Sequence, residues 1–177
     1  MKILRWLLTG LVVIVAALVA VGFMMPSAYR VERTARMEAS PDRVYAMIAD
    51  PREWKRWSVW NRRDPDMKIT YSGPPSGAGA AWAWESKSEG TGNMTFTKAE
   101  SNRRIEYALA FPSMGTASRG ALTLVPDGQG SLVAWSNEGD VGANPLYRLF
   151  VPFMDGMVGG DFSAGLANLK ALVEKNG

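Results

Sequence analysis

The sequence contains no cysteine and no histidine among its 177 residues. Without cysteine, a chain forms no disulfide, no thiolate nucleophile and no cysteine-ligated zinc site. Without histidine, it has no Ser-His catalytic triad and no imidazole ligand for a metal. We therefore predict no metal site and no cofactor, and we assign no residue a catalytic role.

The chain also lacks a strong excess of charge. Its net charge is +3, and the part that follows position 25 carries all 17 acidic and 18 of the 20 basic residues, which leaves that part at +1. A nucleic-acid-binding protein needs a concentrated basic surface to neutralise phosphates. We therefore predict no nucleic-acid partner. The length predicts about one domain.

A long uncharged segment occupies the N-terminus. No charged residue occurs between Arg5 and Arg30, a gap of 24 residues, and residues 6–25 are almost wholly apolar. At about 1.5 Å per residue, a helix over residues 6–25 would cross the roughly 30 Å hydrocarbon layer of a bilayer. This segment therefore predicts a membrane-spanning helix.

Two alternatives to a permanent anchor are a cleaved signal sequence and a soluble helix. A cleavage site needs small residues in an A-x-A pattern after a shorter apolar core, whereas Pro26-Ser27-Ala28 begins with proline. We therefore expect an uncleaved, single-pass anchor in residues 1–26 and a ligand-binding domain in residues 27–177. Lys2 and Arg5 give the segment a signal-like layout, which favours a domain outside the cytoplasm. Three arginines between positions 30 and 36 nearly balance that charge count.

The first part of the domain reads as a strand followed by two short helices. A short extended segment is expected within residues 27–38. Ser40-Pro41-Asp42 then has the composition of a helix start, and Val44 and Ile48 recur at i, i+4. Asp50-Pro51 repeats the start signal for the second helix.

From Met67 to Asp140 the apolar period changes to two. Residues 104–111 are the clearest example, and glycine and proline clusters separate about six such segments. This pattern predicts an antiparallel meander with one buried face. A last helical stretch starts at Asn144-Pro145, is interrupted by Pro152, and continues as a long helix.

Four stretches of the chain resemble the SRPBCC superfamily (START-like, birch-pollen-allergen-like) in its polyketide cyclase/dehydrase branch. They are Ser40-Pro41 to Asp50, the Trp54–Asn61 block, Val133–Ser136 and Asp155–Ala171. The resemblance covers about residues 30–175 and rests on diffuse patterns and strand order, with no catalytic signature.

This resemblance implies an α+β helix-grip fold, in which a curved seven-stranded antiparallel sheet wraps around a long C-terminal helix. Two short helices would follow the first strand, and the N-terminal transmembrane helix would be an addition to the family domain. The implied function is binding of a hydrophobic small molecule or lipid in an internal cavity, with catalysis in only some members.

Every second residue of the strands should face the C-terminal helix. Large apolar side chains dominate these positions, and they form either an ordinary core or the wall of a ligand pocket. Tyr107, Ser118 and Asn137 share this parity and could anchor a polar group of the ligand. The residues that we predict to line the cavity are Trp57, Trp82, Trp84, Met94, Phe96, Tyr107, Leu109, Leu122, Trp135, Asn137, Met157 and Phe162.

Other residues have two interpretations. Glu138 and Asp140 have the opposite parity and should point outward, which leaves no inward acid–base pair. The Trp54–Trp60 block closes one end of the sheet as core, or else forms an exposed lip at the cavity mouth or the membrane. Four glycines between positions 156 and 165 of the last helix mark close approach to the sheet, or else space for a ligand.

Three functions follow from these patterns. The leading hypothesis is a membrane-anchored, non-catalytic module that binds a hydrophobic small molecule or lipid. The alternative is a polyketide cyclase/dehydrase-type enzyme acting on an aromatic or polyketide-like substrate, for which Tyr107 is the best inward proton-transfer group. The second alternative is a protein-interaction module of the cell envelope, with a filled cavity and an exposed Trp54–Trp60 block.

Overall fold

The segments with period two form the strands of one antiparallel sheet. The computed structural model describes residues 2–175, and its seven strands follow the order β1-β7-β6-β5-β4-β3-β2. β2 to β7 pair in succession, while β1 crosses over to pair with β7. The strands are β1 (Ala28–Met37), β2 (Lys68–Ser72), β3 (Ala81–Ser86), β4 (Gly90–Glu100), β5 (Arg104–Phe111), β6 (Thr116–Asp127) and β7 (Gly130–Asp140).

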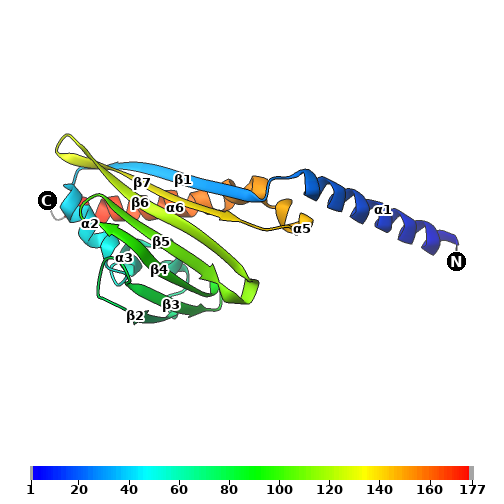
Figure 1. The fold of residues 1–177 in the computed structure, drawn as a ribbon, viewed down its shortest axis with the longest axis horizontal. Coiled ribbons are helices and arrows are strands. Elements are labelled where there is room, and N and C mark those ends of the chain that lie inside the picture. Colours follow the sequence, from blue (N-terminus) through cyan, green and yellow to red (C-terminus); the bar gives the residue numbers. More distant parts are fainter. Residues whose placement is uncertain (1, 176–177) are drawn as a thin grey trace.

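Short helices connect β1 to β2, as the sequence predicts. α2 (Pro41–Ala49) begins with proline in its first turn. The second expected helix is divided into α3 (Trp54–Trp57) and α4 (Val59–Arg63), because Ser58 between them has extended backbone angles. These helices lie at the concave face of the sheet (Figure 1).

The C-terminal stretch is interrupted where proline predicts it. α5 (Pro145–Arg148) is followed by a 3-10 turn, η2 (Val151–Phe153), which contains Pro152. The long helix α6 (Met154–Glu174) then runs back along the sheet and packs chiefly against β1 (Figure 1). A 3-10 turn, η1 (Pro112–Met114), joins β5 to β6. This arrangement confirms the expected helix-grip fold.

The glycines of α6 separate into two kinds. A Cβ on Gly159 would lie 1.9 Å from the Arg33 guanidinium, and one on Gly165 would lie 2.8 Å from the Trp135 ring. These two glycines therefore permit close approach of α6 to the sheet. Gly156 and Gly160 are exposed, and a Cβ on either would meet no atom within 4 Å, so they leave no space for a ligand beneath the helix.

The Trp54–Trp60 block belongs to the interior. Trp54 and Trp57 are buried, and their indole N–H groups donate to the carbonyls of Ile48 (2.9 Å) and Met47 (3.2 Å). The interpretation of the block as an exposed lip at the cavity mouth or the membrane is therefore wrong for Trp54 and Trp57. The block closes the sheet from the concave side.

α1 (Lys2–Met24) projects away from the domain (Figure 1). Its apolar window has a mean hydropathy of 2.7, and the helix is long and apolar enough to cross a membrane. Its last turn packs against α5, where a Cβ on Gly22 would lie 2.2 Å from the Pro145 carbonyl oxygen.

Candidate functional site

A cavity of about 480 Å³ lies between the concave face of the sheet, α4 and the first half of α6. Its wall is mostly apolar and aromatic because the inward positions of β3, β4, β5 and β7 carry such side chains. Nine of the twelve residues expected from the sequence lie along it: Trp82, Trp84, Met94, Tyr107, Leu109, Trp135, Asn137, Met157 and Phe162.

The other three expected residues, Trp57, Phe96 and Leu122, lie in the packed core beside the cavity and do not line it. All three have the inward orientation that the sequence predicts. Phe96 and Leu122 are excluded from the cavity because helices α2 and α3 and the C-terminal half of α6 fill the space opposite them, and Trp57 is part of α3 and belongs to the same core. Trp57, for example, packs between Trp54 (ring centroids 4.6 Å apart) and Trp135 (5.3 Å).

The cavity opens at one end of the sheet. Four of its lining residues are exposed: Met114, Ala117, Asp140 and Met157. They come from the β5–β6 turn, the start of β6, the end of β7 and the start of α6. The end of β7 pairs with the start of β1, so this end of the sheet is also the one from which α1 leaves the domain. We call this opening the mouth.

Glycines on the strands leave room for the aromatic rings of the wall. Tyr107 is paired with Gly120 in the adjacent strand, where a Cβ would lie 2.3 Å from the tyrosine oxygen. Trp84 covers Gly92 in the same manner, at 2.4 Å. The rings therefore lie over the neighbouring strand, a position that a Cβ would forbid.

A small cluster of polar side chains, Tyr29, Ser118 and Asn137, interrupts the apolar wall of the cavity. The Asn137 amide donates to Ser118 Oγ at 3.2 Å, and the Tyr29 hydroxyl donates to Asn137 Oδ1 at 3.5 Å. Burial raises the pKa of Tyr29, and its hydrogen bond with Ser118 partly offsets that rise. These three side chains can hold one polar group of an otherwise apolar molecule.

The Tyr107 hydroxyl both donates and accepts a hydrogen bond within the protein. The hydroxyl donates to the Ser136 carbonyl at 3.1 Å and accepts from Trp135 Nε1 at 3.0 Å. Burial raises the pKa of Tyr107 to about 12. Its phenol is therefore protonated at neutral pH, and the proton is already committed to a backbone carbonyl.

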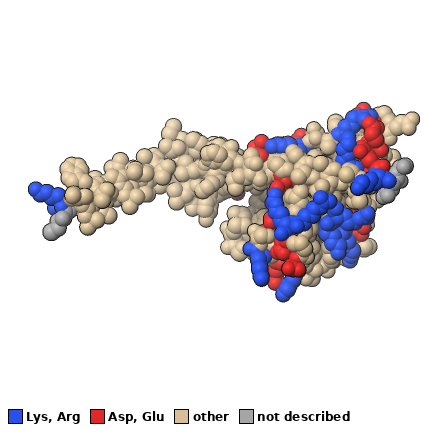
Figure 2. All heavy atoms as spheres, turned by 180° about the vertical axis from the view of Figure 1, so that it is seen from behind, with Lys and Arg blue, Asp and Glu red and all other residues tan. Residues whose placement is uncertain are grey.

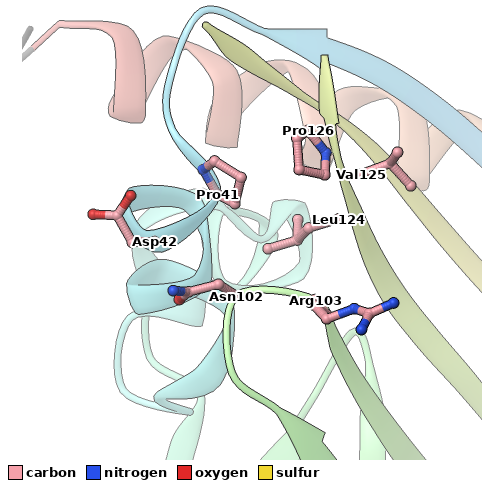
Figure 3. A pocket seen from close by; sticks show the side chains of 7 residues that line it. All are labelled: Pro41, Asp42, Asn102, Arg103, Leu124, Val125 and Pro126. Carbon is pink, nitrogen blue, oxygen red and sulfur yellow. The ribbon is translucent and has the colours of Figure 1, made fainter. Parts of the chain in front are cut away.

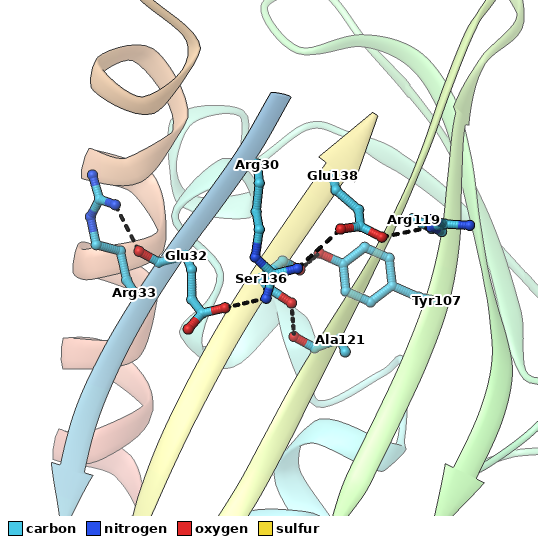
Figure 4. Close-up of polar contacts among 8 residues, drawn as sticks. All are labelled: Arg30, Glu32, Arg33, Tyr107, Arg119, Ala121, Ser136 and Glu138. Carbon is cyan, nitrogen blue, oxygen red and sulfur yellow. Dashed lines mark hydrogen bonds and ion pairs between the residues drawn. The ribbon is translucent and has the colours of Figure 1, made fainter. Parts of the chain in front are cut away.

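The outer face of the sheet carries ion pairs on the same stretch of β7 that borders the cavity on its inner face (Figure 4). Glu138 accepts from Arg119 at 2.7 Å and from Arg30 at 3.0 Å, so it points outward as the sequence predicts. These hydrogen bonds lower the pKa of Glu138, and the hydrogen bond from Arg119 has the larger effect. The expectation for Asp140 needs correction. Asp140 borders the mouth because the strand ends there, and its carboxylate accepts from Ser27 Oγ and the Gly142 amide.

Sequence reasoning missed two carboxylates that border the cavity, Asp161 and Glu89. Trp60 Nε1 donates to Asp161 Oδ2 at 3.1 Å, and the Arg63 guanidinium donates to the same carboxylate at 2.8 Å. Arg63 also lies 3.8 Å from Glu89, and its hydrogen bond with Asp161 raises its pKa. Arg63 thus connects α6 to the β3–β4 turn across the concave side. The only signal in the sequence for this contact is that Asp161 interrupts the apolar residues that recur along the last helix.

No metal site accompanies these carboxylates. Within residues 2–175, no group of three or more acidic, cysteine or histidine side chains is close enough to hold a metal ion. A second, more open hollow of about 590 Å³ lies at the end of the sheet away from α1, between the start of α2 and the β4–β5 and β6 segments (Figure 3). It is a surface depression without a buried polar group.

Comparison with known proteins identifies the domain. The model of the family described as "Polyketide cyclase / dehydrase and lipid transport" matches residues 28–174. No curated protein matches the sequence. The matched range contains the whole sheet and α6 and leaves out α1.

Solved structures share this fold at low sequence identity. Truncated norcoclaurine synthase from Thalictrum flavum has a TM-score of 0.65 at 13% identity, with 84% of this chain and 95% of that chain covered. The Aha1 dimer from Colwellia psychrerythraea has a TM-score of 0.59 at 16% identity, with 82% and 96% covered. The di-domain ARO/CYC StfQ of the steffimycin biosynthetic pathway has a TM-score of 0.62 at 13% identity, with 84% and 51% covered.

Proposed function

The chain belongs to the polyketide cyclase / dehydrase and lipid transport family, and on that premise we propose that it binds a hydrophobic small molecule or lipid in its internal cavity without transforming it. The observation that carries this proposal is the partly enclosed, aromatic-lined cavity of about 480 Å³. Pockets that hold small organic molecules measure roughly 300–1,000 Å³ and are lined mainly by apolar side chains. Burial of apolar ligand surface would supply the affinity.

We propose that the ligand is an amphiphile with one polar end. The polar cluster of Tyr29, Ser118 and Asn137 lies between the apolar wall and the mouth. A hydroxyl, carbonyl or carboxyl of the ligand would exchange hydrogen bonds with these side chains, while its apolar part occupies the space among the tryptophans.

We further propose that residues 1–26 anchor the protein in a membrane as a single-pass helix, and that the binding domain, residues 27–177, lies outside the cytoplasm. The length and hydropathy of α1 support the anchor. The contact of Gly22 with Pro145 supports retention of α1 over its cleavage, because it makes the end of α1 part of the folded protein. Lys2 and Arg5 before the apolar span support the orientation.

The test of binding uses the full chain in a mild detergent. Native mass spectrometry should detect a co-purified apolar molecule, and the protein should take up a fluorescent fatty acid. Leu109→Trp places a larger ring in the cavity and takes space from the ligand, so it should weaken uptake at least about tenfold, which is about 1.4 kcal/mol of binding free energy. Leu132→Trp is the matched control, since Leu132 is exposed on the outside. Equal uptake by both variants, or no uptake by the wild type, would contradict the proposal.

A cyclase-type enzyme is the second candidate, because three carboxylates, Asp161, Glu89 and Asp140, border the cavity. Asp161 and Glu89 are both held by Arg63, and the Tyr107 proton is held by Ser136. An enzyme would need one of these groups to be released when substrate binds. Recovery of the bound molecule with its mass reduced by one water after incubation, abolished by Asp161→Asn, would favour this candidate over binding alone.

The interaction module of the cell envelope required a filled interior and an exposed tryptophan block. The cavity and the burial of Trp54 and Trp57 remove both of its premises. We therefore do not retain it as a proposal.

A further inference from the structure

A patch of exposed apolar side chains surrounds the base of α1. Outside α1, eight large apolar side chains of residues 2–175 are exposed, and six of them lie at the end of the domain that α1 leaves. Five come from the α5–η2–α6 segment, and we call them the apolar foot: Leu146, Tyr147, Phe150, Phe153 and Met157. Water-exposed apolar patches of this kind mark contact surfaces.

The foot occupies one short segment of the chain that contains three helical pieces. Leu146 and Tyr147 belong to α5, Phe150 directly precedes the η2 turn and Phe153 ends it, and Met157 lies in the first turn of α6. All five side chains are exposed, with Phe150 60% and Phe153 64% exposed, so the whole segment presents its large apolar side chains outward.

The contact between α1 and α5 fixes the depth of the foot. Gly22 lies against Pro145, and it precedes the end of the apolar span at Met25 by three residues, about 4.5 Å along a helix. If α1 spans a bilayer, Pro145 must therefore lie near the hydrocarbon boundary. The polar interface beyond that boundary is roughly 5–7 Å thick on each side, so α5 lies where the hydrocarbon layer meets this interface.

The chemistry of the foot fits that layer. Aromatic side chains favour the interface, and the segment from Val141 to Met154 contains a single charged residue, Arg148. Figure 2 shows that, on the face drawn, the uncharged surface of the helix continues onto the adjoining part of the domain, while most charged side chains lie farther away.

The foot is also continuous with the cavity. Met157 belongs both to the foot and to the exposed rim of the mouth, of which Met114 is another exposed apolar residue. A surface on which the foot rests would therefore cover the mouth as well.

We propose that the foot rests on the surface of the lipid bilayer, so that the mouth opens onto the lipid and the ligand passes between membrane and cavity without crossing water. This inference rests on the proposed membrane anchor. It goes beyond that anchor because a tethered domain could equally stand clear of the bilayer with its mouth in water.

The absence of cysteine in the chain makes a direct test simple. Single-cysteine variants of the full chain, Phe153→Cys in the foot, Val13→Cys in α1 and Val125→Cys at the opposite end of the domain, are labelled with the fluorophore NBD. They are reconstituted in phosphatidylcholine vesicles that contain a spin-labelled phosphatidylcholine quencher. Val125 is the matched control, because it is 55% exposed but belongs to the far end of β6.

The expected result is lipid-borne quenching at positions 153 and 13, and several-fold stronger quenching by aqueous iodide at position 125 than at position 153. Lipid quenching at position 13 alone would overturn the foot and leave the anchor standing. Loss of lipid quenching at both positions would overturn the anchor, and the foot with it. Phe150→Cys repeats the measurement at a second foot position in case one label perturbs its site.

Transfer kinetics test the role of the mouth. Phe150→Ser combined with Phe153→Ser changes two side chains that do not line the cavity. The double variant should release a fluorescent fatty acid to the vesicles several-fold more slowly, with unchanged affinity in detergent. An unchanged release rate would show that the ligand leaves through water, and it would contradict the proposal even if binding itself is confirmed.

Discussion

The concave face of the sheet has two halves that share one strand pattern and differ in what covers them. Along β5, Ile105 and Tyr107 are buried, whereas Leu109 and Phe111, with the same parity, are only half-buried. The buried half faces α2, α3 and the end of α6. The half nearer to α1 faces the start of α6, where Met154 and Val158 are only partly buried and Met157 is exposed.

This difference shows that strand period alone does not decide between core and cavity. An inward side chain becomes core where a helix packs directly against it, and becomes a cavity wall where the facing helix leaves a space between them. The aromatic rings at the boundary mark the transition: Trp135 stacks on Phe162 with centroids 4.1 Å apart, and both rings border the cavity from the packed side.

The largest expected contrast between the halves lies within α6. Leu166 is 1% exposed, and Leu166→Ala should reduce the free energy of unfolding by about 2–5 kcal/mol. Met157→Ala, on the same helix but 64% exposed, should change it by less than about 0.5 kcal/mol. Denaturant unfolding of both full-length variants in the same detergent checks this. Equal losses would mean that the start of α6 is packed in solution.

Tyr107 stands at the boundary, and its titration offers the next contrast. Its pKa is raised to about 12 from an ordinary value of 10.0, so the folded state disfavours the phenolate. The stability from the neutral phenol is therefore complete below pH 10 and is lost as the pH rises toward 12. The loss amounts to about 2–3 kcal/mol, at about 1.4 kcal/mol for each pH unit between the two values.

Tyr107→Phe separates the stability that is lost when Tyr107 ionises from the effects of ionising the other tyrosines. The variant is less stable at neutral pH, because Trp135 Nε1 then has no acceptor. Its stability should nevertheless fall less steeply than that of the wild type between pH 10 and 12. Parallel curves for the two proteins, measured by denaturant unfolding across this range, would show that the Tyr107 hydroxyl is not buried.

The sequence predicted the sheet, its hairpins and the seven lining residues that lie on strands, because parity along a strand is a local property. It could not separate Met94 from Phe96, which share a face of β4, since only the position of the covering helices places one at the cavity and the other in the core. It could not find Asp161 for the same reason. The partners of that carboxylate, Trp60 and Arg63, are about a hundred residues away in the chain.

The glycines of α6 give a smaller contrast with opposite signs. Gly165→Ala would place a Cβ 2.8 Å from the Trp135 ring, which is stacked and cannot move freely, and should cost about 1–3 kcal/mol. Gly156→Ala meets no atom within 4 Å and should stabilise the helix by about 0.4–1 kcal/mol. Thermal unfolding of the two variants checks both signs. Stabilisation by both would place α6 farther from the sheet than the structure does.

The smallest effect is expected on the outer face, which is the control for both halves. Glu138 bridges Arg30 and Arg119, but these side chains are 57% and 81% exposed, so water and salt screen the attraction. The pKa of Glu138 is lowered in the folded state, so any stability from the pair is present above the ordinary glutamate pKa and is lost as the pH falls below it. Glu138→Gln should therefore leave the unfolding midpoint at neutral pH within measurement error and leave fatty-acid uptake unchanged. A clear loss of uptake would mean that the outer face acts on the cavity through β7, where Asn137 is the next residue, and the separation of core, cavity and outer face would have to be abandoned.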